Sequence, residues 1–294
     1  MKKMAVVIIA ILITMSIAHT VSASGSVGIT IGYGKRGFTS NFNMPDPTIR
    51  ESDRRAITIG ISAGIYVVDR LSIAFNGTYL MGKHSVKYND VRREAPSFSG
   101  VNLHLFGRYD VLASSKYKIG VQVGAIYELL KDRMDFSGSG TNYEVKHTYE
   151  GTLSTISIAA GIYGEVEVLP KLSIFANAKI PIVEWKSGDA VAKLDRKVLN
   201  NPLLDDVTEY QFSRLTENTF WKKFMYDIEL GLKYQINPKV SVGLFGHISN
   251  INMDVLSLSA ITVRDNGFTN SRWERAPLYS SPAFSIRLGA EYAF

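Results

Sequence analysis

Apolar and polar residues alternate with a period of two in ten separate segments of this chain. The segments are Val27–Tyr33, Ile57–Val67, Leu71–Met81, Val101–Tyr109, Tyr117–Leu129, Ile156–Val168, Leu172–Ile180, Tyr226–Ile236, Val240–Ile248 and Ser285–Phe294. A period of two is typical of a β-strand with one apolar and one polar face. A soluble β-sandwich also produces this pattern, so the connections between the segments have to decide the architecture.

The connections alternate between short and long. Every second junction is a tight turn, with the sequences VVDR, LASSK, LPK and INPK. The other junctions are long, at about 38–55, 82–98, 131–150, 186–223 and 250–282. Short turns at one end and long loops at the other are typical of outer-membrane barrels. The sequence therefore predicts an all-β fold, a transmembrane antiparallel up-and-down β-barrel of ten strands with short periplasmic turns and five long extracellular loops.

The N-terminal segment differs from the rest of the chain. Lys2 and Lys3 precede an apolar run of about fourteen residues, and Val21–Ala23 fits the small-x-small cleavage rule. That run is shorter than the roughly 20 residues of a spanning helix, although an uncleaved anchor is the alternative. We expect residues 1–23 to be a signal peptide and residues 24–294 to be an integral barrel of the cell outer membrane.

Aromatic residues lie near both ends of the predicted strands, on their apolar faces. Tyr117, Tyr234, Tyr292 and Phe294 adjoin the short turns, while Tyr33, Tyr79, Tyr127 and Tyr226 adjoin the long loops. Two such belts are expected at the two membrane interfaces. The last strand should therefore face lipid, and its Leu288, Tyr292 and Phe294 resemble the C-terminal signal read by the outer-membrane assembly machinery.

The opposite faces of the same strands carry charges of both signs. Those predicted to point into the lumen are Arg108, Lys118, Glu128, Glu165, Glu167, Lys179, Asp227, Glu229, Lys233, Arg287 and Glu291. An unpaired charge in a narrow interior costs several kcal/mol, so we expect these groups to form an ion-pair network. A barrel of this size is only slightly wider than eight-stranded barrels, whose side chains fill the interior, so we expect a plugged lumen.

Residues with chemical reactivity do not form a recognisable constellation. The chain has no cysteine, and the histidines of the mature chain, His84, His104, His147 and His247, are not spaced as metal ligands. His104 and His247 are expected to be hydrogen-bonded residues of the lumen. We expect no metal, no cofactor and no nucleic-acid partner. The charge balance, with 33 basic and 27 acidic residues, argues neither for nor against acidic partners.

The architecture resembles that of the omptins, a family of outer-membrane surface proteases. The stretches that carry the resemblance are RLSIAFNGTYLMG, YKIGVQVGAIYE and INPKVSVGLFGH, together with the number of strands and loops. The resemblance implies an Asp-x-Asp pair and an Asp-x-His pair that activate water. Asp90 matches the first of these positions, but Arg92, Ala190 and Ala192 stand at the other three. The fold is thus predicted without the catalytic residues.

Two regions of the surface are candidates for contacts. The loops 186–223 and 250–282 mix charged and apolar residues, so we expect them to contact an unknown extracellular partner, with a hairpin turn at Asp265-Asn266-Gly267. Lys83, Lys131, Arg133 and Lys222 lie just beyond the outer aromatic level. They are expected to contact outer-membrane lipid and the phosphates of lipopolysaccharide, the alternative being solvated lysines and arginines.

These observations together predict an integral outer-membrane β-barrel with a non-enzymatic surface role. That role would be adhesion, contact with a host or a phage, or a structural part of the envelope. The first alternative is an omptin-type surface aspartyl endopeptidase whose catalytic groups lie at other positions. The second alternative is a narrow channel through the lumen.

Overall fold

The computed structural model describes residues 24–40, 51–88, 91–139, 143–198, 206–214, 226–249, 255–265, 268–272 and 277–294. The predicted signal peptide, residues 1–23, lies outside the described residues. The described part is built from β-strands: β1 (Gly25–Ser40), β2 (Glu51–Val68), β3 (Leu71–Tyr88), β4 (Val91–Ala113), β5 (Tyr117–Ser139), β6 (Tyr143–Leu169), β7 (Leu172–Val198), β8 (Asp206–Arg214), β9 (Asp227–Asn237), β10 (Val240–Ser249), β11 (Val255–Asp265), β12 (Phe268–Arg272) and β13 (Pro277–Ala293). Within this part, no helix is long and apolar enough to cross a membrane.

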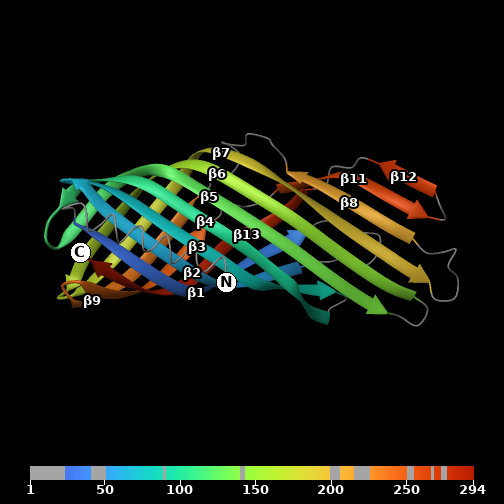
Figure 1. The fold of residues 1–294 in the computed structure, drawn as a ribbon, viewed down its shortest axis with the longest axis horizontal. Helices are drawn as coiled ribbons and strands as arrows, with labels where there is room; N and C mark the ends of the chain where they lie inside the picture. The colour runs from blue at the N-terminus through green and yellow to red at the C-terminus, as the bar shows by residue number, and fades with distance from the viewer. Residues whose placement is uncertain are drawn as a thin grey trace.

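The strands close into a barrel (Figure 1). Each strand from β1 to β7 pairs antiparallel with the next, β7 pairs with β9, β9 with β10, β10 with β13, and β13 with β1. This closed ring of ten strands confirms the predicted fold. Closure leaves no exposed edge, so the backbone hydrogen bonds can all be made within the wall.

Two places in the ring are occupied by interrupted strands. β7 pairs with β9 over 172–179 and with β8 over 189–196, so β8 continues the position of β9 farther from the short turns. In the same way β13 pairs with β10 over 283–292 and with β11 over 277–279. β12 lies outside the ring and pairs with β11, with Asp265 opposite Phe268. The predicted hairpin at Asp265-Asn266-Gly267 is therefore confirmed, because only two residues connect these partners.

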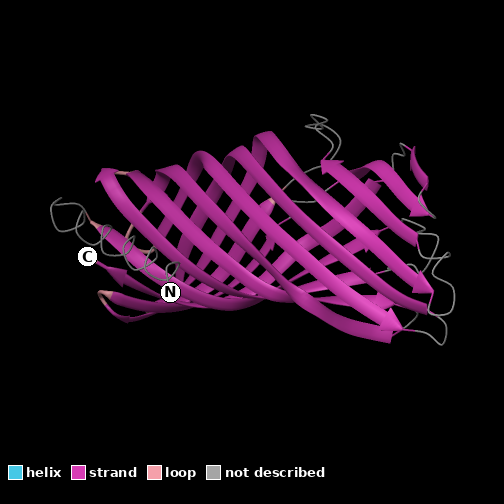
Figure 2. Cartoon of the chain, turned by 45° about the vertical axis from the view of Figure 1, so that its right-hand side comes forward, coloured by secondary structure: helices cyan, strands magenta, loops and turns pink. Residues whose placement is uncertain are grey.

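The strands are much longer than the alternating segments of the sequence (Figure 2). β6 and β7 each contain 27 residues, whereas about 9–11 residues cross a bilayer. The long connections are therefore largely strand, and the predicted loop ranges, including 186–223 and 250–282, are wrong for much of their length. The physical reason is that both faces of a strand become polar outside the apolar layer, so the two-residue pattern ends while the hydrogen-bonded ladder continues.

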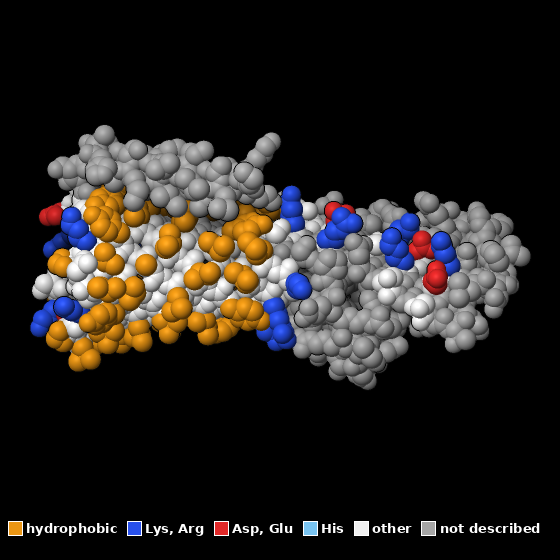
Figure 3. Space-filling view, turned by 60° about the horizontal axis from the view of Figure 1, so that its bottom comes forward, with side chains coloured by type: hydrophobic (Ala, Val, Ile, Leu, Met, Phe, Trp, Pro, Cys, Tyr) orange, Lys and Arg blue, Asp and Glu red, His pale blue; other side chains and the backbone are white. Residues whose placement is uncertain are grey.

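The outer surface is apolar and the inside is polar, the reverse of a soluble protein. Isoleucine, valine and leucine side chains of every barrel strand are exposed, among them Ile162 at 63% and Leu288 at 61%. Among the described residues, fourteen polar or charged side chains are buried and only six apolar ones. Figure 3 shows the apolar side chains covering the part of the barrel near the short turns, with Lys and Arg at both borders of that area. This surface requires lipid around it.

Glycines on the inner face allow the strands to approach closely. A Cβ atom on Gly161 of β6 would press on the carbonyl oxygen of Ala178 and lie 2.9 Å from the Lys179 Cα. We expect Gly161→Ala to lower the free energy of unfolding by about 1–3 kcal/mol, because backbone and not a flexible side chain has to move. Urea titration in detergent micelles, followed by tryptophan fluorescence, measures this loss.

The matched control is Gly64→Ala on β2, also on the inner face. Its Cβ would lie 3.7 Å from the Ser26 Oγ, an ordinary contact distance. We expect a change within about 0.5 kcal/mol for this variant. Equal losses in the two variants would show that close approach of β6 and β7 is not the cause.

Candidate functional site

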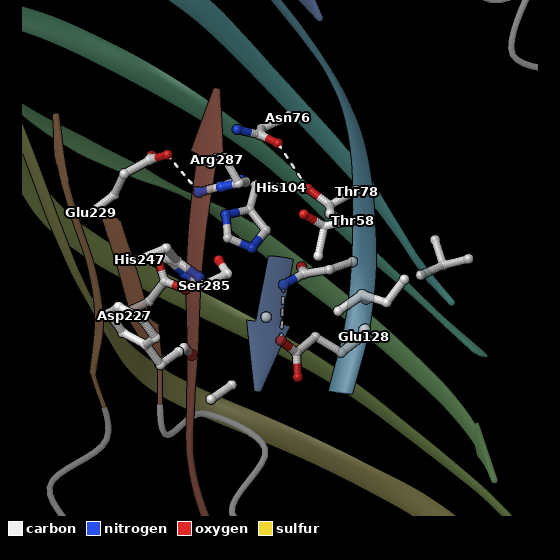
Figure 4. A pocket seen from close by; sticks show the side chains of 18 of the residues that line it. Thr58, Asn76, Thr78, His104, Glu128, Asp227, Glu229, His247, Ser285 and Arg287 are labelled. Carbon is white, nitrogen blue, oxygen red and sulfur yellow. Dashed lines mark hydrogen bonds and ion pairs between the residues drawn. The ribbon is translucent and has the colours of Figure 1, made fainter. Parts of the chain in front are cut away.

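A group of polar side chains, three of them buried and one half-buried, lies in the lumen. His104 comes from β4, Lys179 from β7, Asp227 from β9 and His247 from β10; we call these four residues the central cluster. Figure 4 labels His104, Asp227 and His247. An apolar residue follows each of them on its own strand, so the two-residue period directs it inward. The cluster therefore joins the neighbouring strands β7, β9 and β10 to β4, which is not their neighbour in the ring.

Asp227 is the centre of the cluster. Its Oδ1 accepts a hydrogen bond from Lys179 Nζ at 2.9 Å, and its Oδ2 lies 2.7 Å from His247 Nε2. Lys179 Nζ also lies 2.9 Å from His104 Nδ1. The side chains of Lys179 and Asp227 are 5% and 1% exposed, so both charges depend on these contacts for their solvation. His104 and His247 are thus hydrogen-bonded in the lumen, which confirms the prediction for both.

A second ion pair and a small apolar group accompany the central cluster in the lumen. Arg287 Nη2 donates to Glu229 Oε1 at 2.6 Å. Lys179 Nζ lies 5.4 Å from the centre of the Phe106 ring, a cation–π contact. Phe106, Ile126 and Ala159 form a small buried apolar group. Charged, aromatic and aliphatic side chains together cross the barrel here.

Two cavities lie beside the central cluster. The cavity toward the long strand ends has a volume of about 110 Å³ and is lined by the central cluster, Ser249 and Leu130. The cavity toward the short turns has a volume of about 640 Å³ and also contacts His104 and Lys179. Since both cavities contact these two side chains, the central cluster lies at the level where they approach each other.

Hydrogen bonds line the larger cavity. Lys233 Nζ lies 2.9 Å from Glu291 Oε2 and 3.4 Å from Glu165 Oε2. Asp110 accepts hydrogen bonds from the hydroxyl groups of Tyr66, at 3.0 Å, and of Tyr163. The side chains of Lys233, Glu165 and Glu291 are 20%, 35% and 31% exposed, more than those of Lys179 and Asp227, so solvent screens their charges more strongly. Asp110 is buried.

Seven of the eleven charges predicted for the lumen form ion pairs: Lys179, Asp227, Arg287, Glu229, Lys233, Glu165 and Glu291. The other four have hydrogen bonds to neutral groups. Arg108 Nε donates to Gln122 Oε1 at 3.2 Å, and Lys118 Nζ donates to the Tyr66 hydroxyl at 3.1 Å. Glu128 accepts from Asn102 at 2.9 Å, and Glu167 accepts from the Lys171 backbone N–H at 3.0 Å.

Sequence reasoning missed the neutral partners of these charges. Tyr66, Tyr163, Gln122 and Asn177 point inward, and Gln122 Nε2 donates to Asn177 Oδ1. Their positions follow the same two-residue period as the charges, so parity could have identified them. Parity does not identify which inward groups meet, because that depends on the heights of the strands.

The remaining predicted site residues lie on the outer surface or outside the described residues. Lys83, Lys131 and Arg133 are exposed, and so are Leu288 and Tyr292 of the last strand. Phe294 is half-buried beside Gly25, with which it exchanges backbone hydrogen bonds. Asp90 and Lys222 lie outside the described residues.

The central cluster contains the chemical elements of a water-activating pair, namely a carboxylate hydrogen-bonded to an imidazole. Its surroundings differ from those of a general base that meets a substrate, because Asp227 is almost fully buried and ion-paired to Lys179. Within the described ranges, no group of three or more acidic, His or Cys side chains is arranged to hold a metal ion. The geometry is that of a neutralised cross-link between β7, β9 and β10.

Comparison with known proteins agrees with this fold. The outer membrane protease OmpT from Escherichia coli is similar, with a TM-score of 0.53 at 10% identity over 93% of this chain and 99% of that chain. Two other outer-membrane structures are less similar. The P. putida toluene transporter TodX gives a TM-score of 0.40 at 8% identity over 93% of this chain and 90% of that chain. The transport unit of the autotransporter AIDA-I from Escherichia coli gives 0.40 at 11% identity over 92% and 90%.

The sequence itself matches no known family model and no curated protein. At 10% identity the likeness to the omptin structure concerns the fold alone. The omptin-like ten-stranded architecture expected from the sequence is confirmed, and the protein is a β-barrel of the outer-membrane type.

Proposed function

We propose that this protein is a non-enzymatic surface protein of the outer membrane that presents its long strand ends to an extracellular partner. The observation that carries the proposal is the length of the wall. The apolar outer surface of β6 and β7 ends near Ile156 and Trp185, yet the paired strands continue as far as Tyr143 and Val198. A rigid paired wall outside the membrane is suited to holding a binding surface.

The interior supports this role over a channel. Lys179 and Asp227 stand opposite each other on the neighbouring strands β7 and β9, and Lys179 Nζ also contacts His104 of β4. Arg287 of β13 pairs with Glu229 of β9. Ions would have to displace buried, mutually neutralised groups to pass this level. Adhesion, contact with a host or a phage, or a structural part of the envelope all fit a barrel that does not conduct.

The proposed orientation places the short turns in the periplasm, as is usual for bacterial barrels. Cleavage of residues 1–23 after export and recognition of the last strand by the assembly machinery belong to the same proposal. The supporting feature of that strand is its row of exposed side chains Phe284, Ile286, Leu288 and Tyr292, which ends at Phe294.

Lipopolysaccharide is the proposed lipid partner at the other edge of the apolar surface. Lys35, Arg55 and Lys83 are exposed and stand directly opposite one another on β1, β2 and β3. Lys131 and Arg133 on β5 are exposed as well. Phosphate groups are suited to contact such a row of exposed basic side chains. This row supports the predicted contact and adds Lys35 and Arg55 to it.

The test uses the absence of cysteine from the chain. Single variants Lys193→Cys at the long strand ends and Lys116→Cys at a short turn are treated in intact cells with a large, impermeant maleimide. We expect labelling of the first variant alone, and of both after the cells are lysed. Purified protein in a planar bilayer is expected to show no discrete conductance steps. Labelling of the short-turn cysteine in intact cells, or clear single-channel steps, would contradict the proposal.

A surface endopeptidase is the second candidate, and the hydrogen bond between Asp227 and His247 is the observation that favours it. Its test is cleavage of basic peptides by the protein reconstituted with lipopolysaccharide. Activity that is lost in His247→Gln, a variant with a similar shape, would establish this candidate. Absence of cleavage by the wild-type protein would exclude it for such substrates.

A further inference from the structure

The four short hairpins of the barrel end in the same way. In each one a basic residue is the last residue of the turn, and a large residue begins the next strand. The pairs are Arg70-Leu71, Lys116-Tyr117, Lys171-Leu172 and Lys239-Val240. We call Arg70, Lys116, Lys171 and Lys239 the turn cations. Their recurrence at one position of every short hairpin places positive charge around the whole short-turn end.

The backbone of each turn cation is held by the next hairpin. The carbonyl oxygens of the four residues accept hydrogen bonds from the backbone N–H groups of Asp110, Glu167, Gln235 and Ala293, respectively, at 2.7–2.8 Å. These donors belong to β4, β6, β9 and β13. Each turn is therefore hydrogen-bonded to the strand that comes after its own hairpin in the order of the ring. The backbone at each turn cation therefore has a fixed position, and its exposed side chain starts from that position.

Two of these positions carry a cation against the local preference of the backbone. Arg70 has φ 67° and Lys171 has φ 69°, in the left-handed region where glycine is free of strain. A non-glycine residue in this region is a reason to look for a function of its side chain. The side chain kept in both turns is a cation.

The turn cations lie at the edge of the apolar surface. Val67, Val68 and Leu71 beside Arg70 are 56%, 58% and 41% exposed, and Tyr117 next to Lys116 is 43% exposed. Leu169 is 61% exposed in the hairpin of Lys171. Basic side chains border the apolar area at this end in Figure 3. A lipid bilayer that covers these apolar side chains brings its phosphate groups to the level of the turn cations.

Acidic side chains also lie at the short-turn end, but they do not cancel the positive charge of the four turn cations. Asp69 precedes Arg70 in its turn, and Glu167 accepts a hydrogen bond from the Lys171 backbone N–H, which stabilises that turn. Glu165 and Glu291 point inward to Lys233. The outward charge of this rim is therefore mainly that of the turn cations.

We propose that Arg70, Lys116, Lys171 and Lys239 form a ring that binds the phosphate groups of anionic phospholipids in the leaflet at the short-turn end. The inference rests on the membrane location proposed above, and adds a second, chemically distinct lipid contact to it. Each fixed cation beside an apolar side chain can contact one headgroup phosphate and the start of its acyl chains. A soluble anionic polymer is not favoured, because the cations border an apolar surface.

The experiment compares two triple variants with equal loss of charge. Lys116→Gln/Lys171→Gln/Lys239→Gln removes most of the ring, and Lys146→Gln/Lys193→Gln/Lys197→Gln removes three exposed lysines from the long strand ends. Both are made in a Lys35→Gln/Arg55→Gln/Lys83→Gln background. This background removes the basic row at the other edge of the apolar surface, so that this row contributes little to lipid binding. The full mature chain is reconstituted in phosphatidylcholine vesicles, and electron paramagnetic resonance measures the association of spin-labelled phosphatidylglycerol relative to spin-labelled phosphatidylcholine.

We expect the background protein and the long-end variant to prefer phosphatidylglycerol by about two- to fivefold at low salt, because cations near the membrane surface attract anionic lipids. The ring variant should lose this preference, and high salt should weaken it in the others. An equal loss of the preference in both triple variants would show that net charge, and not the ring, causes it, which would overturn the proposal. An unchanged preference in the ring variant would overturn it as well. A chain that inserts but shows no preference refutes the ring alone, whereas a chain that does not insert refutes the proposed membrane function too.

A glycine substitution separates binding from folding. Lys171→Gly should relieve the backbone at φ 69°, leaving stability toward urea equal or higher, while lowering the preference for phosphatidylglycerol as much as Lys171→Gln does. A lower stability of Lys171→Gly would show that the cation has a structural role instead.

Discussion

Asp227→Ala is expected to lower the free energy of unfolding of the barrel by about 3–5 kcal/mol. The substitution removes the partner of Lys179, whose side chain is 5% exposed, and of His247. Lys179 would then be a buried charge left with His104 as a neighbour. Urea titration of the protein in detergent micelles, followed by tryptophan fluorescence, measures the change.

Two further variants locate the cause of this loss. The double variant Asp227→Leu/Lys179→Met removes both charges, and we expect it to regain most of the lost stability, because well-packed apolar residues often replace a buried pair without cost. Lys193→Ala removes an exposed lysine opposite Glu209 and should change stability by less than about 1 kcal/mol. A loss below about 1 kcal/mol for Asp227→Ala would mean that water solvates the cluster.

Ile162→Arg is expected to lower the stability of the barrel in lipid by about 2–4 kcal/mol. Ile162 is 63% exposed on the outer face of β6, between the exposed side chains of Ile158 and Val166. In water a positive charge at so exposed a position would be harmless, whereas in the middle of a hydrocarbon layer it has to be buried in lipid. The measurement is reversible unfolding in phospholipid vesicles.

Thr152→Arg is the control for this prediction, on the same strand and the same face. Thr152 is exposed opposite Lys131, beyond the apolar surface. We expect a change of about 0–1 kcal/mol at this interfacial level. If the two arginine variants had equal stabilities in vesicles, the apolar outer surface would not be in contact with lipid.

The membrane-facing half of the fold could be predicted residue by residue. Alternation on β9 placed Leu230, Leu232 and Tyr234 outside. The same alternation predicts that Asp227, the first residue of that strand, points inward. The short turns were recognisable because two or three residues with turn chemistry interrupt the alternation. One face of each strand meets lipid and the other meets a polar lumen. An apolar residue is therefore predicted to point outward and a polar residue inward.

The wall beyond the apolar surface could not be predicted in the same way. Lys146 and Asp195 stand opposite each other on β6 and β7, in a region where both faces of the strands carry polar residues. Water surrounds both sides there, so the chain needs no alternation to be stable as a strand. For the same reason the replacement of β9 by β8 beside β7 had no signal in the sequence.

The sequence by itself determined that the chain forms a ten-stranded barrel, which face each membrane-level residue occupies, and that charges of both signs enter the lumen. Only the tertiary structure decided that Asp227 meets Lys179, which is 48 positions away, and His247 on the neighbouring strand. A period of two gives the direction of a side chain but not its height along the barrel. Height is set by the register of hydrogen bonds around the closed ring, and that register depends on all the strands together.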